Sequence, residues 1–220
     1  MDKVTLEDTS ADYALIELLG PTAAAVMQNA GLVLPASDTS LETFAGVPAR
    51  LLRRTGGWRL LLPASAATAA THLLGAAGAQ ALTPESYNIW RVEAGLPEAG
   101  FEWVDEYTPL ETGLVRAVSD SKGCYTGQEV IARQITYDKV TRQLAGLQLS
   151  APAQLGERVY PLDGEAPAGV ITSTAQSPRF GPIALAVLKR PHHLPGTAVS
   201  LGAPSNERRG HVTGLPFRAD

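Results

Sequence analysis

Alternating apolar and polar positions near the start of the chain predict strands. Residues 12–20, DYALIELLG, place successive side chains on opposite sides of an extended backbone, as a half-buried strand does. Residues 49–63, ARLLRRTGGWRLLLP, contain two strand-like runs joined at Thr55-Gly56-Gly57. Glycine tolerates the positive φ angles of a tight turn, so this stretch predicts a β-hairpin.

Helix start and stop signals accompany these strands. Pro21 is expected to begin a helix that Gly31 ends, and residues 63–78 form an alanine-rich helical stretch. Residues 83–95, TPESYNIWRVEAG, carry the clearest punctuation, with Thr83 as N-cap, Pro84 at the first helical position and Gly95 at the end. The N-terminal part of the chain is therefore expected to mix helices and strands.

Residues 96–122 show no sustained period of 2 or 3.6. Loops longer than about 15 residues are uncommon inside compact domains and are usually functional or disordered. This one holds five large apolar side chains, too many for a disordered linker: Phe101, Trp103, Tyr107, Leu110 and Leu114. We therefore expect an ordered covering segment that delivers the next motif to a pocket.

From residue 144 onward, short apolar runs alternate with Gly, Pro, Asp and Ser. Strands at this spacing predict a small barrel or sandwich, and the tail from Asn206 is expected either to add one more strand or to fray. The fold class expected is α+β. An α/β domain built on an antiparallel sheet should occupy residues 1–143, and a small C-terminal β-barrel should occupy residues 144–220.

Composition narrows the class of protein. The 220 residues (23.1 kDa) are 45% hydrophobic and 18% charged, which suits a globular protein with one good core or two modest ones. No apolar run approaches the roughly 20 residues of a membrane span, and the start lacks the apolar stretch of a secretory signal. A single cysteine excludes an internal disulfide, so a cytoplasmic location is expected. Net charge is −4 and basic residues are scattered, which argues against binding nucleic acid through charge.

That cysteine lies in residues 119–133, SDSKGCYTGQEVIAR. Thr126 and Glu129 have capping-box spacing, which predicts a helix from Gly127 to about Gln134. Cys124 would then precede a helix N-terminus and follow Lys122, and both positive influences favour a reactive thiolate. Local physics leaves the alternative open that Cys124 is a small buried hydrophobe beside a tight turn.

Several stretches resemble one protein family. The residues KGCYTGQEVIAR resemble the signature of the YgfZ family of folate-binding proteins, relatives of the glycine-cleavage T-protein, an aminomethyltransferase. In addition, VTLEDTSADYALIELLGPTAAAVMQ, RVEAGLP and GVITSTAQSP…IALAVLKR are similar to T-protein stretches in the same order. The resemblance covers nearly the whole chain and implies a GcvT-like domain followed by the family's barrel.

The resemblance implies a tetrahydrofolate-binding accessory protein that maintains iron–sulfur enzymes, with Cys124 as the working thiol and iron–sulfur proteins as partners. One alternative is an aminomethyltransferase-like one-carbon transferase that uses tetrahydrofolate. Another is a relative that has kept the fold and lost the ligand. The first is favoured because the cysteine motif is complete, whereas the family's opening segment, with its proposed catalytic aspartate, has no counterpart here. Trp58 and Arg59 also replace a turn whose following glutamate grips the pterin in T-proteins.

Five residues are candidates for holding the folate. The resemblance implies Arg91, which matches an arginine that T-proteins direct at the ligand. Lys122 and Tyr125 offer a cation and a stacking ring to a flat, acidic cofactor. Gln128 is a further candidate, with helix capping as its alternative role, and Arg133 can hold an anion or a nearby carboxylate.

Two further expectations concern metals and self-association. The histidines lie in different segments without paired metal-ligand spacing, so no metal site is expected: His72, His192, His193 and His211. Lacking the family's opening segment, the chain should expose a sheet edge or an apolar face. It is therefore expected to form a homodimer or to cover that face with its own N-terminus.

Overall fold

The computed structural model describes residues 3–119, 121–204 and 206–217. The chain divides into two compact units, the first running to Leu82 and the second starting at Thr83. The mixed α+β fold class expected from the sequence is confirmed, because an antiparallel sheet with helices is followed by a closed barrel. No helix within the described ranges is long and apolar enough to cross a membrane.

A four-stranded antiparallel sheet forms the frame of the first unit, in the order β1-β4-β3-β2. The strands are β1 (Tyr13–Leu19), β2 (Thr39–Phe44), β3 (Val47–Arg54) and β4 (Gly57–Pro63). The predicted first strand and the β3–β4 hairpin are confirmed. The edge strand β2 was not predicted; it pairs with β3 through a two-residue turn, Ala45-Gly46, in which both residues have positive φ.

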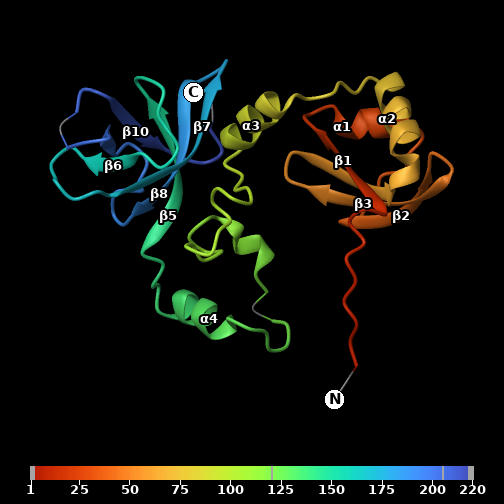
Figure 1. The fold of residues 1–220 in the computed structure, drawn as a ribbon, viewed down its shortest axis with the longest axis horizontal. Coiled ribbons are helices and arrows are strands. Elements are labelled where there is room, and N and C mark those ends of the chain that lie inside the picture. The colour runs from red at the N-terminus through yellow and green to blue at the C-terminus, as the bar shows by residue number, and fades with distance from the viewer. Residues whose placement is uncertain (1–2, 120, 205, 218–220) are drawn as a thin grey trace. The chain divides into compact units, whose positions relative to one another are not determined.

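Two helices and one face of this sheet share a core. Helix α1 (Ala23–Asn29) buries Met27, and α2 (Ala67–Ala76) buries Leu74 after a 3-10 turn, η1 (Ala64–Ala66). Figure 1 shows both helices beside the sheet strands in red and orange. Pro21 lies just before the N-cap of α1 rather than at the first helical position. Burying each large aliphatic side chain contributes about 1.5–3 kcal/mol, so this core is a main source of stability for the first unit.

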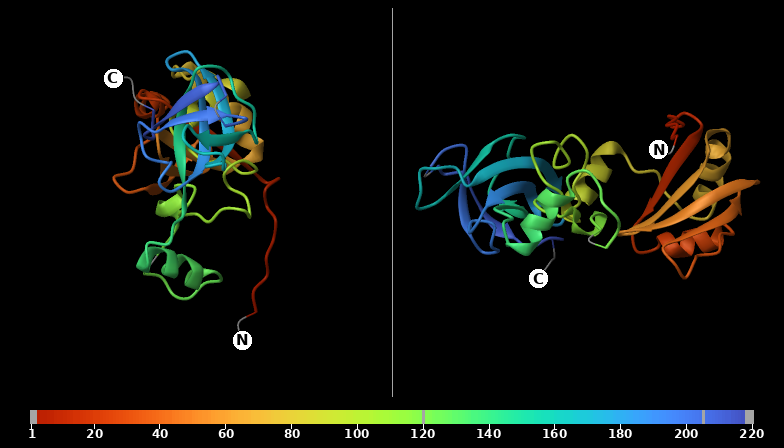
Figure 2. Two further views of the ribbon diagram at one scale, coloured as in Figure 1. Left: turned by 90° about the vertical axis from the view of Figure 1, so that its left-hand side faces the viewer. Right: turned by 90° about the horizontal axis from the view of Figure 1, so that it is seen from below.

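The second unit contains a closed barrel with strand order β10-β5-β8-β7-β6-β9. Its strands are β5 (Arg142–Leu149), β6 (Arg158–Pro161), β7 (Gly169–Ser177), β8 (Gly181–Lys189), β9 (Ala198–Leu201) and β10 (Arg209–Thr213). Figure 2 shows the same strands, in green to blue, from two further directions. The barrel predicted from the strand spacing is present, and its first strand begins two residues before the predicted position. The tail adds a strand, β10.

Helix α3 (Pro84–Glu93) packs against β7 and β8. The predicted cap is present, because the Thr83 side chain accepts a hydrogen bond from the Ser86 amide at 3.1 Å. Val92 is fully buried in a cluster with barrel residues that include Leu185. The helix therefore carries its last turn, and Arg91 with it, onto the outside of the barrel.

The segment after α3 is ordered by turns, with one 3-10 turn, η2 (Leu114–Ala117). Helix α4 (Gln128–Thr136) follows the cysteine motif and has no buried residue. The predicted capping box was wrong: Gly127 is the N-cap, with φ of 88°, and no side chain caps the helix. A glycine in the left-handed region lets the chain turn into the helix without the extended backbone that a threonine cap requires. Both Figure 1 and the left view of Figure 2 show α4 set apart from the barrel strands.

The compact units do not coincide with the predicted domains. Helix α3, the long segment and α4 fall in the second unit together with the barrel. The assignment of residues 1–143 to one domain and 144–220 to another stays a prediction about inherited domains.

Candidate functional site

A pocket of about 750 Å³ lies within the second unit. Two stretches line it, the long segment after α3 and the stretch from Lys122 through the first turn of α4. The first stretch contributes Glu102, Trp103, Val104, Asp105, Tyr107, Thr108, Pro109, Thr112, Leu114, Ala117, Val118 and Ser119, and the second contributes Lys122, Tyr125, Thr126, Gly127, Val130 and Ile131. The expectation that the long segment meets the cysteine motif at a pocket is thus confirmed.

The part of the long segment that lines the pocket is called the pocket wall below. Arg91 anchors its N-terminal end from outside the pocket. Its side chain is only 2% exposed, and its Nε lies 2.6 Å from Oε2 of Glu98 as an ion pair, although the N–H is not directed at that oxygen. Its Nη1 donates to Ser173 Oγ at 3.0 Å and approaches Oε2 of Glu102 at 3.5 Å. The buried cation therefore joins the pocket segment to the barrel.

Glu102 is the pocket residue that contacts both Arg91 and Ser173. Its carboxylate is fully buried, and Ser173 Oγ donates to Oε1 at 2.5 Å. The backbone amide of Glu98 donates to Oε2 at 3.2 Å. Ser173 lies where the β7–β8 pairing shifts register after Ile171, so a bulge in the barrel supplies this donor.

A second buried carboxylate holds the other end of the wall. Arg142 donates through Nε to Oε1 of Glu111 at 2.9 Å and through Nη2 to Oε2 at 3.2 Å. The same Nη2 donates to the Glu106 carbonyl oxygen, and the guanidinium carbon lies 5.0 Å from the centre of the Tyr107 ring. Two arginines, from α3 and β5, thus fix the two ends of an otherwise irregular segment.

This second pair shifts the pKa values of its members. Burial alone would raise the pKa of Glu111, but hydrogen bonds from Arg142 and Thr108 outweigh it and leave that pKa below its usual range. The hydrogen bond to Glu111 raises the pKa of Arg142. Burial, with the nearby Glu106 carboxylate, raises the pKa of Tyr107. The wall therefore holds an ionised carboxylate and a neutral phenol at neutral pH.

Lys122 and Tyr125 line the pocket together, as two of the predicted ligand-binding residues. The Lys122 Nζ lies 4.6 Å from the centre of the Tyr125 ring. The Tyr125 hydroxyl donates to the Ser119 carbonyl oxygen at 3.4 Å. The cation and ring expected from the sequence are therefore adjacent, and they also contact each other.

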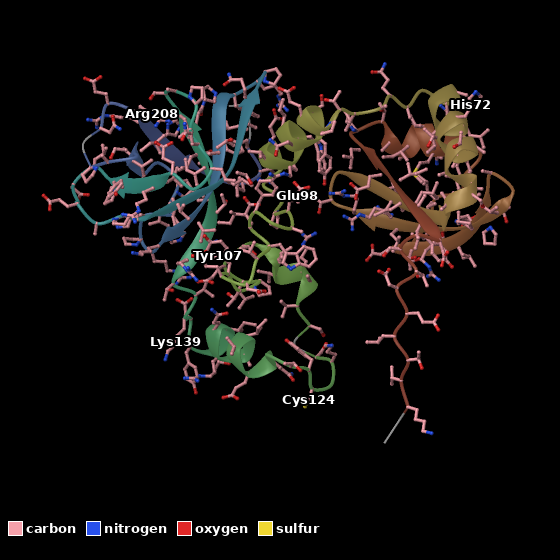
Figure 3. All side chains as sticks on the ribbon, in the orientation of Figure 1. His72, Glu98, Tyr107, Cys124, Lys139 and Arg208 are labelled. Carbon is pink, nitrogen blue, oxygen red and sulfur yellow. The ribbon has the colours of Figure 1, made fainter. Side chains whose placement is uncertain are left out.

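The other predicted site residues lie elsewhere. Cys124 is exposed at the loop before α4 and is not among the pocket residues (Figure 3). Gln128 is half-buried and Arg133 exposed, and neither lines the pocket. Arg91 reaches it only through Glu102. Within the described ranges, no three His, Cys, Asp or Glu side chains gather as a metal ion requires.

Sequence reasoning did not find the residues that shape the wall. Glu102, Glu111 and Arg142 were not singled out, because ion pairs between residues 11 and 31 positions apart leave no local pattern. Trp103 was noted only as one of the large apolar side chains that predict an ordered segment. The absence of any regular period, together with those side chains, was the available signal.

An antiparallel sheet with helices followed by a closed barrel is the order of structures found in proteins built like the glycine-cleavage T-protein. Residues 1–122 match the GCVT N-terminal domain, and residues 142–218 match the glycine cleavage T-protein C-terminal barrel domain. The chain belongs to this family. The resemblance to T-proteins stated above is confirmed, whereas these matches do not single out the YgfZ branch.

Individual relatives agree with the family match. An aminomethyltransferase from Saccharopolyspora erythraea is 35% identical over 235 residues, covering 96% of this chain and 61% of the relative. A chloroplastic protein of Arabidopsis thaliana, named provisionally as a transferase, is 30% identical over 226 residues, covering 99% of this chain and 51% of the relative. The chain thus spans between about half and three-fifths of these relatives.

A solved structure shares the fold. The crystal structure of the glycine cleavage system aminomethyltransferase T from Bartonella henselae superposes with a TM-score of 0.72 at 24% identity. The match covers 94% of this chain and 60% of that one. This similarity supports the fold alone.

Proposed function

We propose that this protein binds a folate and acts as a one-carbon transferase of the aminomethyltransferase type, with the pocket of the second unit as the ligand site. The observation that carries the proposal is the pocket itself, a cavity of about 750 Å³ lined by aromatic rings, hydroxyls and a lysine, in a chain of the T-protein family. Ligand pockets commonly measure about 300–1,000 Å³, so the volume of this pocket is within the usual range for a small-molecule site.

The lining suits a flat ring that carries a polar edge and an acidic tail. Trp103, Tyr107 and Tyr125 supply ring surface, and the hydroxyls of Thr108 and Thr112 supply hydrogen-bonding groups. Lys122 supplies the positive charge that an acidic tail requires. Gln128 and Arg133 follow on the adjoining helix and remain candidates for contacts with that tail.

Arg91 takes a different part in this proposal. Its guanidinium is buried and faces Glu98, Glu102 and Ser173, so its contribution to ligand binding is to hold the wall. For Arg91 to contact the folate directly, its guanidinium would have to break its contacts with Glu98, Glu102 and Ser173.

Two measurements test the proposal. Calorimetry with tetrahydrofolate under reducing conditions should give saturable binding that Tyr125→Ala and Lys122→Ala weaken. Incubation with an aminomethyl donor and tetrahydrofolate should give turnover. Binding without turnover would leave a folate-binding protein that is not a transferase, and no heat at millimolar ligand would favour a relative that has lost the ligand.

A second candidate rests on the exposed thiol. Cys124 lies free at the surface within the motif that resembles the YgfZ signature, which favours an accessory role toward iron–sulfur proteins in the cytoplasm. Cys124→Ser should abolish that role and leave transferase turnover unchanged, because Cys124 does not line the pocket. Homodimer formation also stays a prediction, which sedimentation of the purified protein would test.

A further inference from the structure

Trp103 is a large aromatic side chain on the pocket wall that is 66% exposed. Aromatic rings contribute most when they are buried or stacked, so an indole held at a pocket with most of its surface in water is an uncommon arrangement. Across residues 3–119, 121–204 and 206–217, no ring or cation lies over the Trp103 side chain.

The other two rings of the pocket already carry a cation. Lys122 lies over the Tyr125 ring at 4.6 Å, and Arg142 lies over the Tyr107 ring at 5.0 Å. The Tyr125 hydroxyl is further engaged with Ser119. Trp103 is therefore the pocket ring that is left open to a planar ligand.

The backbone that presents Trp103 is fixed. The Trp103 amide donates to the Glu98 carbonyl oxygen at 3.1 Å, and the Gly100 amide donates to the Trp103 carbonyl oxygen at 3.3 Å. The preceding residue, Glu102, is fully buried against Arg91 and Ser173. Figure 3 places Glu98 at the start of the segment that leads down to Tyr107. The indole thus projects from a hydrogen-bonded turn, so a ligand need not order the backbone on which it stacks.

We propose that Trp103 is the stacking residue of this pocket, and that it selects ligands with a flat, fused heteroaromatic ring. The inference rests on the proposed function and names the part of the ligand that the residue contacts. Stacking on an aromatic side chain tolerates different ring substituents, because every such ring has a π-face. Hydrogen bonds from the polar side chains of the pocket wall would then distinguish ligands whose rings have the same shape but different substituents.

The test compares ligand affinity across a matched set of variants of the full chain. Calorimetry is run with tetrahydrofolate and with pterin, the isolated ring, on the wild type, Trp103→Phe, Trp103→Ala and Val115→Ala. Val115 is a matched control, because it is 56% exposed on the same segment and does not line the pocket. Melting temperatures are measured alongside to verify folding.

The expected result is a loss of about tenfold or more in affinity for both ligands in Trp103→Ala, the scale of one base–aromatic stacking contact. Trp103→Phe should retain most of the affinity, Val115→Ala should match the wild type, and melting temperatures should stay unchanged. Equal affinity of Trp103→Ala and wild type overturns this inference alone. Loss confined to tetrahydrofolate would assign Trp103 to the tail and also overturn it. A wild type that binds neither ligand overturns this inference and the proposed function together.

Discussion

Arg142 and Glu111 form a bidentate ion pair in which β5 of the barrel holds the pocket segment. The two hydrogen bonds measure 2.9 and 3.2 Å, and the Glu111 side chain is 4% exposed. The backbone supports the same junction, because the Leu144 amide donates to the Glu111 carbonyl oxygen at 2.7 Å. The pocket wall is therefore anchored to the barrel rather than lying loosely over it.

Removing one partner of this pair should destabilise the second unit. Arg142→Met leaves the buried Glu111 carboxylate without its cation, and breaking a buried ion pair typically costs about 3 kcal/mol or more. Since the Arg142 side chain is 32% exposed, we expect about 2 kcal/mol in urea unfolding. The control is Glu106→Gln, whose carboxylate lies 3.9 Å from Arg142 and is largely exposed. It should change stability by less than about 0.5 kcal/mol, and an equal loss in the two variants would contradict this account.

The same pair should make stability depend on pH in a defined window. The folded-state pKa of Glu111 is lowered, because the hydrogen bonds from Arg142 and Thr108 outweigh the effect of burial. Its contribution is therefore fully present above the unfolded value near 4.5 and is lost as the pH falls through the lower folded value. Thermal melting between pH 7 and pH 3 should show this loss. In Glu111→Gln the curve should be flatter below pH 4.5, and a curve as steep as that of the wild type would assign the acid sensitivity to other groups.

Replacing Arg91 should first of all reduce the stability of the folded protein. Arg91→Ala leaves Glu102 buried without a cation, which should cost about 3 kcal/mol. Adding Glu102→Gln should recover part of this loss, because the amide keeps a hydrogen-bond acceptor and removes the charge. Glu98→Gln is the matched control, since Glu98 is 38% exposed and can be solvated. A fully stable Arg91→Ala variant with weakened folate binding would instead support the direct contact.

Cys124 should react freely in the folded protein. The thiol is exposed, so iodoacetamide labelling of the native chain should approach the rate for the urea-unfolded chain. Cys124→Ser should change unfolding free energy by less than about 0.5 kcal/mol, as exposed substitutions usually do. If Lys122 assists the thiolate, Lys122→Ala should slow labelling in the folded state alone. An unchanged rate would mean that Lys122 serves Tyr125, over which it lies.

The sequence predicted most of the fold where local chemistry decides it. Thr83, Pro84 and Gly95 mark the ends of α3 because caps and glycine terminators act over three or four residues. The hairpin at Thr55-Gly56 was also predictable, because a glycine at the turn is a local signal. Strand β2 was missed because half of the side chains in Thr39–Phe44 are exposed, so the segment has few apolar residues that would predict a strand. Its hydrogen bonds to β3, which the sequence pattern does not show, hold it in the sheet.

The candidate site was predictable only in part. Lys122 and Tyr125 come from one short motif, and their proximity follows from their spacing. The opposite holds for Arg91, Glu102 and Ser173, which come from α3, the long segment and β7. Only the folded chain brings them together, so a residue that the family resemblance assigned to the ligand turned out to have its charge already occupied.

The two buried arginine–glutamate anchors also determine which solution conditions the pocket wall can sense. Mobile ions screen exposed charges over about 8 Å at physiological salt but hardly reach buried pairs. Arg190 and Asp138, an exposed pair near α4, belong to the first kind, whereas Arg91 and Glu102 belong to the second. Ionic strength should therefore weaken the Arg190–Asp138 pair and leave the two buried anchors intact, so that ligand affinity varies with salt through the exposed cations Lys122 and Arg133.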